Sequence, residues 1–546
     1  MSSERTSCTC PQKERQGCGL EARAVITDAR NLPSGEQLEC DVCIVGAGIA
    51  GISLARSLEQ SGMRVVILES GGLHPTPETD ALSDGESNLP DYPFAASRVR
   101  SFGGSSCAWT GACIQMDEAD FESRSWVPHS GWPIKARDIS PYLDRARETL
   151  GLPEKDRLRD DLAKTPLASD IVTAKTVAYA TPRNVGARFQ SEIEKSASIN
   201  CLLNATVTNL GLEQDGERIN KVKARTLDGS EMEVAARSVV LTAGGLENAR
   251  LLLASNDVAP EGVGNSHDTV GRYHMEHPIR AVGTLSIRPR QHRQYLPYTD
   301  VVKRDGVALK GTFGVSAKCR QNNELLDMNL LVYRYSMMEE MASVVGGKAL
   351  AQDGVTVGKL LEYAATHNVR FATEVLPYIG WHVWNKVHKC ARFNHVRFMA
   401  FVEQEPNPEN RIALSDRRDA LGVPLAKLTY SESARMEDSM HRSLAIMSQD
   451  FEARGVGTLR YRADEIRHLR AYDAYGLHPM GSTRMSRDPK HGVVDADCRV
   501  HGVKNLFVAS CSVFPTGGAA NPTWTIVALA LRLGDYLRQN LRTLPA

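Results

Sequence analysis

Three glycines and one acid near the start of the chain have the types and spacing of a phosphate-binding turn. The stretch DVCIVGAGIAG contains Gly46, Gly48 and Gly51 in the pattern G-x-G-x-x-G. The next apolar run, RVVILE, ends on Glu69. Gly46 permits a tight turn, Gly48 lets the backbone approach a pyrophosphate, and Gly51 lets a helix pack against a strand. A carboxylate at Glu69 would accept from ribose hydroxyls, which favours FAD or NAD over NADP.

The residues on either side of this turn predict the elements that must position it. The apolar run before Gly46 predicts a buried strand, a helical pattern continues to about Gln60, and RVVILE predicts a second strand. The N-terminus of the helix would offer unpaired N–H groups and the positive end of its dipole to phosphates. The pattern therefore predicts a dinucleotide site. The alternative is a Rossmann-like unit that binds no nucleotide.

A further candidate is Asn521, in the stretch FPTGGAANPTWTIV. The helix predicted over 522–537 is among the most apolar in the chain. Asn is a favoured N-cap and Pro suits the first helical turn, so Asn521 is interpretable as a simple cap. A side chain engaged in capping is not free to contact a ligand. The role of Asn521 therefore depends on what this end of the helix faces.

The composition is that of an ordinary globular protein. The 546 residues are 42% hydrophobic and 24% charged, and the formal net charge is zero, which gives no electrostatic reason to expect nucleic acid as a partner. No apolar run approaches the roughly 18 residues of a membrane span. The N-terminal stretch MSSERTSCTCPQKERQG has no export signal, and scattered cysteines are typical of reduced thiols. We expect a cytoplasmic protein.

Neither cysteine cluster predicts a metal site. Cys8, Cys10 and Cys18 lie in a polar head, residues 1–23, which we expect to be disordered and which offers no evident fourth ligand. Cys40 and Cys43 form a CxxC, but they fall at the start of a predicted strand, where residues i and i+3 point to opposite faces.

Five further segments occur in an order that identifies a family. They are RSFGGSSCAWTG (100–111), DFESRSWVPHSGWPI (120–134), SVVLTAGGLENARLLLAS (238–255), GLHPMGSTRMS (476–486) and the segment around Asn521. Together with the glycine turn, they resemble the GMC (glucose-methanol-choline) family of FAD oxidoreductases. The resemblance is greatest to its bacterial branch near pyranose oxidase and the sugar and glycoside dehydrogenases. It runs from about residue 24 to the C-terminus and is weakest over 290–395.

The resemblance implies an α/β fold with two domains that are discontinuous in sequence. A Rossmann-like FAD-binding domain would comprise 24–135, 195–285 and 465–546. A substrate-binding domain, an antiparallel sheet plus helices, would comprise 136–194 and 286–464. Independently, residues 204–238 alternate polar and apolar residues between turns at QDGE and LDGS, which predicts a strand and then a hairpin or meander.

The segment 357–389 has a helical period and is rich in aromatic residues. We interpret it first as a buried core or a subunit face, and a subunit face would make the protein a homo-oligomer. A membrane-surface helix is the alternative.

The resemblance also implies the residues that hold FAD, with adenine bound by the backbone at Val207. The family often has Asp where this chain has Ser510, which makes that contact doubtful. The full set is Gly46, Gly48, Ala50, Gly51, Glu69, Ser70, Gly103, Gly104, Ser105, Ala108, Trp109, Thr110, Gly111, Val207, Ala243, Gly244, Ser510, Asn521, Pro522 and Thr523.

The flavin is expected to be noncovalent. Fungal pyranose oxidases carry a histidine bonded to the flavin 8α-methyl where this chain has Ala108, and alanine has no nucleophile. Cys107 would point the other way if the segment is extended. A redox role for Cys107 is the alternative to simple packing.

The family's catalytic histidine falls on His478 and its second active-site residue, His or Asn, falls on Asn521. A neutral imidazole would take the hydroxyl proton of an alcohol while hydride passes to flavin N5. The Asn521 amide would hold the same oxygen. His274 and His277, in GRYHMEHP, are expected to be structural or pocket-lining rather than metal ligands.

The predicted activity is oxidation of a hydroxyl on a sugar, glycoside or other polyol, with O₂ or another acceptor reoxidising the flavin. Two other hypotheses stay open. A few family members are hydroxynitrile lyases with a structural flavin, and a flavin-holding protein without catalysis would need no base.

Overall fold

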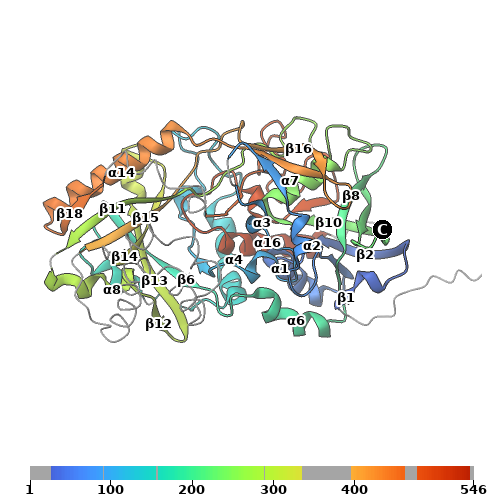
Figure 1. Ribbon diagram of the computed structural model, residues 1–546, viewed down its shortest axis with the longest axis horizontal. Helices are drawn as coiled ribbons and strands as arrows, with labels where there is room; N and C mark the ends of the chain where they lie inside the picture. Colours follow the sequence, from blue (N-terminus) through green and yellow to red (C-terminus); the bar gives the residue numbers. More distant parts are fainter. Residues whose placement is uncertain are drawn as a thin grey trace, which may run out of the picture.

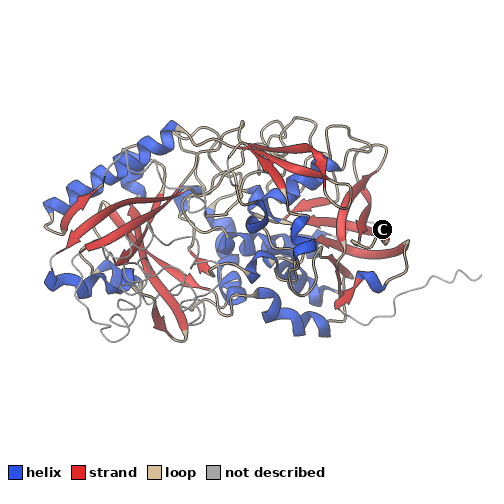
Figure 2. Cartoon of the chain, viewed as in Figure 1, coloured by secondary structure: helices blue, strands red, loops and turns tan. Residues whose placement is uncertain are grey.

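The computed structural model describes residues 26–540 except 90–91, 155, 157, 288, 335–394 and 462–475. The predicted disordered head and the predicted helix over 357–389 lie outside the described residues. The molecule is elongated, with one group of strands towards each end and most helices between them (Figures 1 and 2). This is the expected α/β architecture, a Rossmann-like unit joined to a sheet-plus-helix domain.

The first sheet is built around parallel strands. From one edge the strand order is β1, β7, β3, β2 and β10. On its other side, β10 pairs with two strands: β19 is parallel to it and β9 is antiparallel. β8, β9 and β10 form the predicted meander. The bounds are β1 Ile26–Asp28, β2 Glu36–Val45, β3 Val65–Leu68, β7 Ile199–Leu203, β8 Thr206–Leu212, β9 Ile219–Arg225, β10 Glu231–Leu241 and β19 Leu506–Val508.

The glycine turn connects β2 to α1 (Ile49–Leu58), as predicted. Val42 and Ile44, two residues apart on β2, contact one apolar cluster with α1, α6 (Val185–Lys195) and α16 (Thr523–Asn540). These helices therefore cover one face of the sheet. The apolar sequence of α16 is explained by its position, since one side packs on α1 and another on α4 (Ala136–Leu150).

The second sheet is antiparallel, in the order β18, β11, β15, β14, β13, β6 and β5, with β12 beside β13. α14 (Ala434–Ala453) packs on it through Phe451, whose ring meets that of Phe313 on β13. The bounds are β5 Ala112–Cys113, β6 Val172–Tyr179, β11 Ile279–Ile287, β12 Val302–Arg304, β13 Val307–Val315, β14 Met328–Arg334, β15 His395–Val402 and β18 Gly457–Arg460.

Two strands of this sheet fall inside the ranges assigned to the FAD-binding domain from the sequence. β5 comes from within 24–135, and β11 begins at Ile279, before the expected boundary at 285. β5 pairs with β6 and β11 with β15, so both strands are part of the second sheet.

A small third sheet joins β4 (Gly85–Ser87) to the hairpin of β16 (Arg411–Arg418) and β17 (Pro424–Thr429). Arg250 of α7 (Gly244–Ala254) ties this hairpin to the first domain, because its Nε donates to Pro424 O at 2.7 Å. The other α-helices within the described residues are α2 Pro77–Ala81, α3 Phe94–Ser97, α5 Arg159–Ala163, α8 Leu296–Thr299 and α9 Ala317–Asn322.

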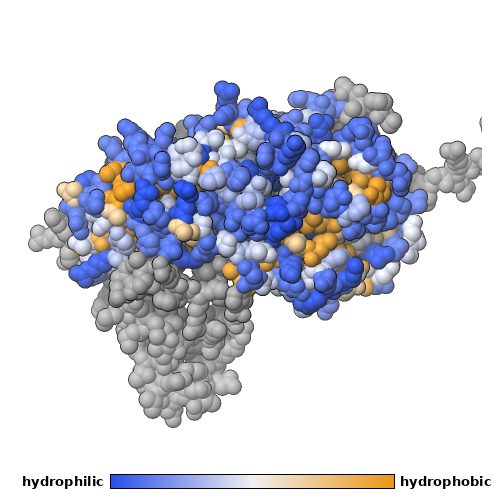
Figure 3. Space-filling model, turned by 90° about the horizontal axis from the view of Figure 1, so that it is seen from above, coloured by the Kyte–Doolittle hydropathy of each residue, from blue (hydrophilic) through white to orange (hydrophobic). Residues whose placement is uncertain are grey.

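The face seen in Figure 3 is mostly hydrophilic, with hydrophobic residues in separate patches. Among the helices of the described residues, none combines the length and apolarity needed to span a bilayer.

Candidate active site

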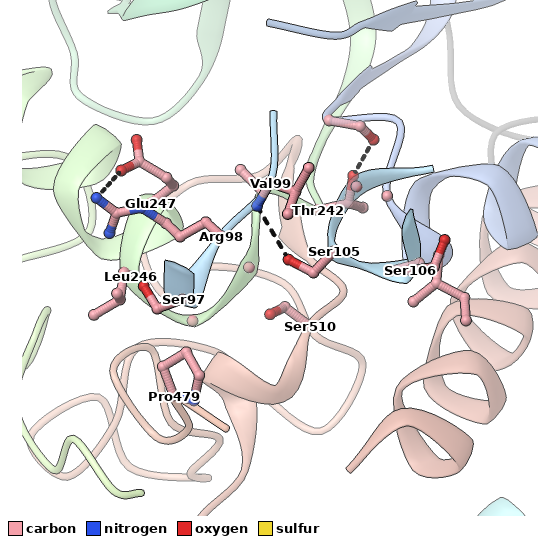
Figure 4. A pocket seen from close by; sticks show the side chains of 18 of the residues that line it. Ser97, Arg98, Val99, Ser105, Ser106, Thr242, Leu246, Glu247, Pro479 and Ser510 are labelled. Carbon is pink, nitrogen blue, oxygen red and sulfur yellow. Dashed lines mark hydrogen bonds and ion pairs between the residues drawn. The ribbon is translucent and has the colours of Figure 1, made fainter. Parts of the chain in front are cut away.

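A cavity of about 480 Å³ lies where the first sheet, α7 and the start of α16 meet, and Figure 4 shows part of its wall. Of the residues predicted to hold the cofactor, Gly51, Gly103 and Gly111 are not on its wall. Those on the wall are Gly46, Gly48, Ala50, Glu69, Ser70, Gly104, Ser105, Ala108, Trp109, Thr110, Val207, Ala243, Gly244, Ser510, Asn521, Pro522 and Thr523, together with His478.

The glycine turn presents the start of α1 to this cavity. Gly48 is the N-cap of α1 and supplies no side-chain cap, so the first turn of the helix meets the cavity with no side-chain hydrogen bond from its own N-cap. A Cβ at Gly51 would lie 2.0 Å from Gly46 O, so Gly51 packs directly against the turn. It therefore does not line the cavity. A Cβ at Gly104 would lie 2.9 Å from Gly48 Cα, so the two glycine segments are in direct contact.

Glu69 lines the cavity, and its carboxylate also holds the turn in shape. One carboxylate oxygen accepts from Ala47 N at 2.7 Å and the other from Gly71 N at 2.9 Å. Burial raises the pKa of Glu69 to about 7, although these two N–H groups oppose the rise. The ribose contact remains a prediction, and the backbone contacts are a role that sequence spacing did not indicate.

Two arginines on the wall were missed by the sequence reasoning. Arg98 lies 3.3 Å from one carboxylate oxygen of Glu247 (Figure 4). Arg100 lies 3.0 Å from the other oxygen, and Glu247 also pairs with Arg250. Burial alone would raise the pKa of Glu247, but the three arginines hold it well below its usual range. The only sequence signal was the position of Arg98 and Arg100 directly before the second glycine cluster.

Arg98 also has spare donors. It is 7% exposed, and its Nε and Nη1 have no hydrogen-bond partner among the described residues. Leaving buried guanidinium donors unsatisfied is costly. A ligand with acceptor atoms at this part of the wall would satisfy them.

A short antiparallel pairing builds the catalytic end of the cavity. Met275 and Met480 exchange two backbone hydrogen bonds of 2.9 Å. Because the two segments are antiparallel, His277, two residues after Met275, lies opposite His478, two residues before Met480. Their Nδ1 atoms are 2.9 Å apart, and Nε2 of His277 lies 2.8 Å from Gly518 O. His277 and His478 are therefore in contact although 201 residues separate them in the chain.

His478 and Asn521 meet in the cavity, as the resemblance predicts. Asn521 Nδ2 lies 3.5 Å from His478 Nε2, at the outer limit of a hydrogen bond. α16 begins at Thr523, and no hydrogen bond from the Asn521 side chain to the first turn is found in the described part of the chain. The amide is thus turned to His478 rather than used as a cap.

The electrostatics keep His478 neutral. Burial, and next the His277 ring, lower the pKa of His478 to about 3. Its backbone N–H donates to Glu276 at 2.8 Å, and the ring stacks on Phe401 of β15 with 6.4 Å between centroids. A neutral imidazole has a lone pair that can accept a proton, and the lowered pKa makes this ring a weaker base than a free imidazole.

The segment before Ala108 is not extended. Gly104–Cys107 form a 3-10 helix because Ser106 and Ala108 bond back to the carbonyls of Gly103 and Ser105. Ala108 nevertheless lines the cavity and Cys107 does not; the Cys107 sulfur lies 3.4 Å from Ser101 Oγ.

Within the described ranges, the one group of side chains close enough to share a metal ion is Asp117, Asp120 and Asp327. Lys175 Nζ lies 2.7 Å from Asp117 and Arg320 pairs with Asp327. Cations of the chain already neutralise this cluster. His274 lies away from it, buried against Tyr430.

Comparison with known proteins agrees with this site. The family model described as GMC oxidoreductase matches residues 406–530, and the model described as FAD binding domain matches residues 39–78. The 2-methyl-1,2-propanediol dehydrogenase of Mycolicibacterium austroafricanum is 24% identical over 91% of this chain and 95% of its own. The fructose dehydrogenase large subunit of Gluconobacter japonicus is 23% identical over 93% and 99%.

Among solved structures, the pyridoxine 4-oxidase of Mesorbium loti shares the fold, with a TM-score of 0.51 and 17% identity over 91% of this chain and 99% of that chain. The chain is therefore similar to GMC oxidoreductases over most of its length, and it is an oxidoreductase that acts on CH–OH groups.

The residues present fit an FAD cofactor. The uncapped start of α1 suits a pyrophosphate. The orphaned donors of Arg98 suit acceptor atoms of a ligand. The close contact of the Gly104 and Gly48 segments leaves backbone, rather than side chains, facing the cavity.

Proposed function

We propose that this protein oxidises a hydroxyl group on a sugar, glycoside or other polyol, with His478 as the general base and FAD as the hydride acceptor. One observation carries the proposal: Nε2 of the neutral His478 lies 3.5 Å from the Asn521 amide nitrogen. Both residues line the same cavity as the glycine turn.

The two side chains divide the work on the substrate hydroxyl. His478 takes the hydroxyl proton at Nε2, and general-base help of this kind is typically worth about 10²–10⁴-fold. Asn521 donates an amide N–H to the same oxygen and fixes its direction. When bound, FAD supplies the N5 atom that accepts the hydride from carbon.

The chain would hold FAD without a covalent bond. The start of α1, Glu69, Arg98 and the backbone near Val207 are the groups we assign to it. Val207 lines the cavity, and a register shift between Val207 and Asn209 interrupts the regular pairing of β8 with β9 there.

The choice of substrate rests on the relatives. One is a dehydrogenase of a small diol and another of fructose. Both substrates carry neighbouring hydroxyls, which supports a polyol, sugar or glycoside for this chain. The electron acceptor, O₂ or another, is left to experiment.

The test is anaerobic mixing of the purified holoenzyme with a panel of diols, sugars and glycosides. We expect at least one to bleach the flavin absorbance, and parallel assays with O₂ and with an artificial acceptor then identify the oxidant. If cyanohydrins are cleaved while no alcohol bleaches the flavin, the protein is a lyase and the proposal is wrong.

A further inference from the structure

We propose that His277 is a positioning residue that fixes the tautomer of His478 and so leaves the Nε2 atom of His478 as the base. The inference rests on the function proposed above. It concerns a residue that the sequence indicated only as structural or pocket-lining.

The contact of His277 with the Gly518 carbonyl determines the tautomers of both His277 and His478. Nε2 of His277 lies 2.8 Å from Gly518 O, and a carbonyl oxygen only accepts, so this nitrogen carries the proton of a neutral ring. Nδ1 of the neutral His277 is then a bare acceptor. It lies 2.9 Å from Nδ1 of His478, which must therefore carry the proton and donate it. Nε2 of His478 is left with its lone pair, and this is the atom nearest Asn521.

The backbone holds both rings in this relation. The exchange of hydrogen bonds between Met275 and Met480 sets the register, and Gly476 N donates to His277 O at 2.8 Å. The two rings are nearly perpendicular, at 89°, which suits an in-plane donor on one ring and an in-plane lone pair on the other. A Cβ at Gly476 would lie 3.0 Å from His478 Nδ1, so glycine leaves room for the ring.

The surroundings of His277 keep its ring neutral. Burial lowers its pKa to about 4, against the opposing effects of the Gly518 carbonyl and of the charges of Glu403 and Asp327. Glu276 binds the His277 backbone N–H rather than the ring, and its own pKa is raised to about 7 by burial. Asp120 lies against Gly518 and is likewise raised to about 7 by burial. Burial outweighs these opposing effects, so the His277 ring is neutral at neutral pH.

The same contact helps after proton uptake. When His478 takes a proton at Nε2, its Nδ1–H becomes part of an imidazolium, and the bond to His277 Nδ1 becomes charge-assisted and stronger. The stronger bond partly offsets the lowering of the His478 pKa by burial and by the His277 ring, and so helps His478 to hold the proton it takes from the substrate.

Two variants separate positioning from packing. The amide of His277→Asn falls near the position of Nδ1, so it keeps an acceptor for His478 but loses the donor to Gly518. The amide of His277→Gln falls near the position of Nε2, so it keeps the contact with Gly518 and loses the acceptor. Each is prepared as holoenzyme with ¹⁵N-labelled histidine, alongside wild type and His478→Ala for assignment of the His478 signals.

In wild type and His277→Asn, the ¹⁵N spectrum should show His478 protonated at Nδ1 and bare at Nε2. In His277→Gln the proton should move, wholly or in part, to Nε2. With a substrate from the panel, flavin reduction should slow by roughly 10²-fold in His277→Gln and by less than about tenfold in His277→Asn.

A wild-type His478 protonated at Nε2, or a His277→Gln enzyme that is faster than His277→Asn, would overturn the inference; the second result would show that His277 serves only to hold Gly518. The spectrum needs no substrate. It decides the tautomer even if no alcohol reduces the flavin, which would be a failure of the proposed function instead.

Discussion

At the residue scale, the site depends on buried polar groups that each have one protonation state or one orientation. The His478 ring is kept neutral by its surroundings, and Asn521 is turned from the helix it precedes towards His478. An amide is suited to this place because it donates an N–H without changing charge as the reaction proceeds. The position of Asn521 just before α16 thus explains why a helix this apolar is preceded by an amide.

We predict that Asn521→Ala slows flavin reduction by roughly 10–10²-fold, because one donor to the substrate oxygen is lost. Thermal unfolding should shift little, since the described first turn of α16 takes no bond from this side chain. Asn521→Asp is the matched variant: it has the same size but, when ionised, no donor, and it should be at least as slow. If Asn521→Ala kept full activity but unfolded at a clearly lower temperature, Asn521 would be a helix cap and not a substrate contact.

At the element scale, the strand–turn–helix unit holds the cofactor end of the cavity by backbone contact. Gly46 has φ of +104°, a conformation that favours glycine. Gly51 permits α1 to touch the turn, and Glu69 ties the turn to the loop after β3. The unit is thus stabilised by its own groups before any ligand binds.

Gly48 and Gly51 should fail in different ways. A Cβ at Gly51 meets Gly46 O at 2.0 Å, so Gly51→Ala should lower both FAD content and the stability of the apoprotein, the latter by about 1–3 kcal/mol. A Cβ at Gly48 meets only Thr242 O, at 3.9 Å, so Gly48→Ala should keep apoprotein stability and lose FAD affinity. Denaturant unfolding and flavin fluorescence measure the two effects. Wild-type FAD affinity in Gly48→Ala would contradict a phosphate contact there.

At the scale of the whole molecule, the reacting end of the cavity lies where the two large sheets meet. His277 directly precedes the region of β11, Phe401 belongs to β15, and His478 and Asn521 lie beside the first domain. Binding sites commonly occur at such junctions between domains. The cavity is therefore formed only when segments from most of the chain are folded together.

We predict that unfolding releases FAD completely. Ala108 offers no nucleophile. Cys511 also lines the cavity, but burial raises the pKa of its thiol to about 12, and the thiol donates to Pro479 O at 3.2 Å. A thiol kept protonated is a poor nucleophile. After acid precipitation of the holoenzyme the supernatant should be yellow. A yellow pellet over a colourless supernatant would be the contrary result.

The features that could be predicted from the sequence are those set by residues close together in the chain. The glycine turn, the meander of β8 to β10 and the helix after Asn521 follow from residues close together in the chain. The contact of His277 with His478 does not, because 201 residues separate them and only strand register brings them together. The same holds for Arg98 and Glu247, where a buried ion pair joins α7 to a distant segment.

The central claim is that His478 is the base, and anaerobic stopped-flow reduction of the bound flavin tests it most directly. A substrate found in the panel is mixed with wild type and with His478→Ala, each checked for equal FAD content. We expect full FAD occupancy in the variant and a reduction rate constant lower by roughly 10²-fold or more. A variant that holds FAD and is reduced nearly as fast as wild type would contradict it.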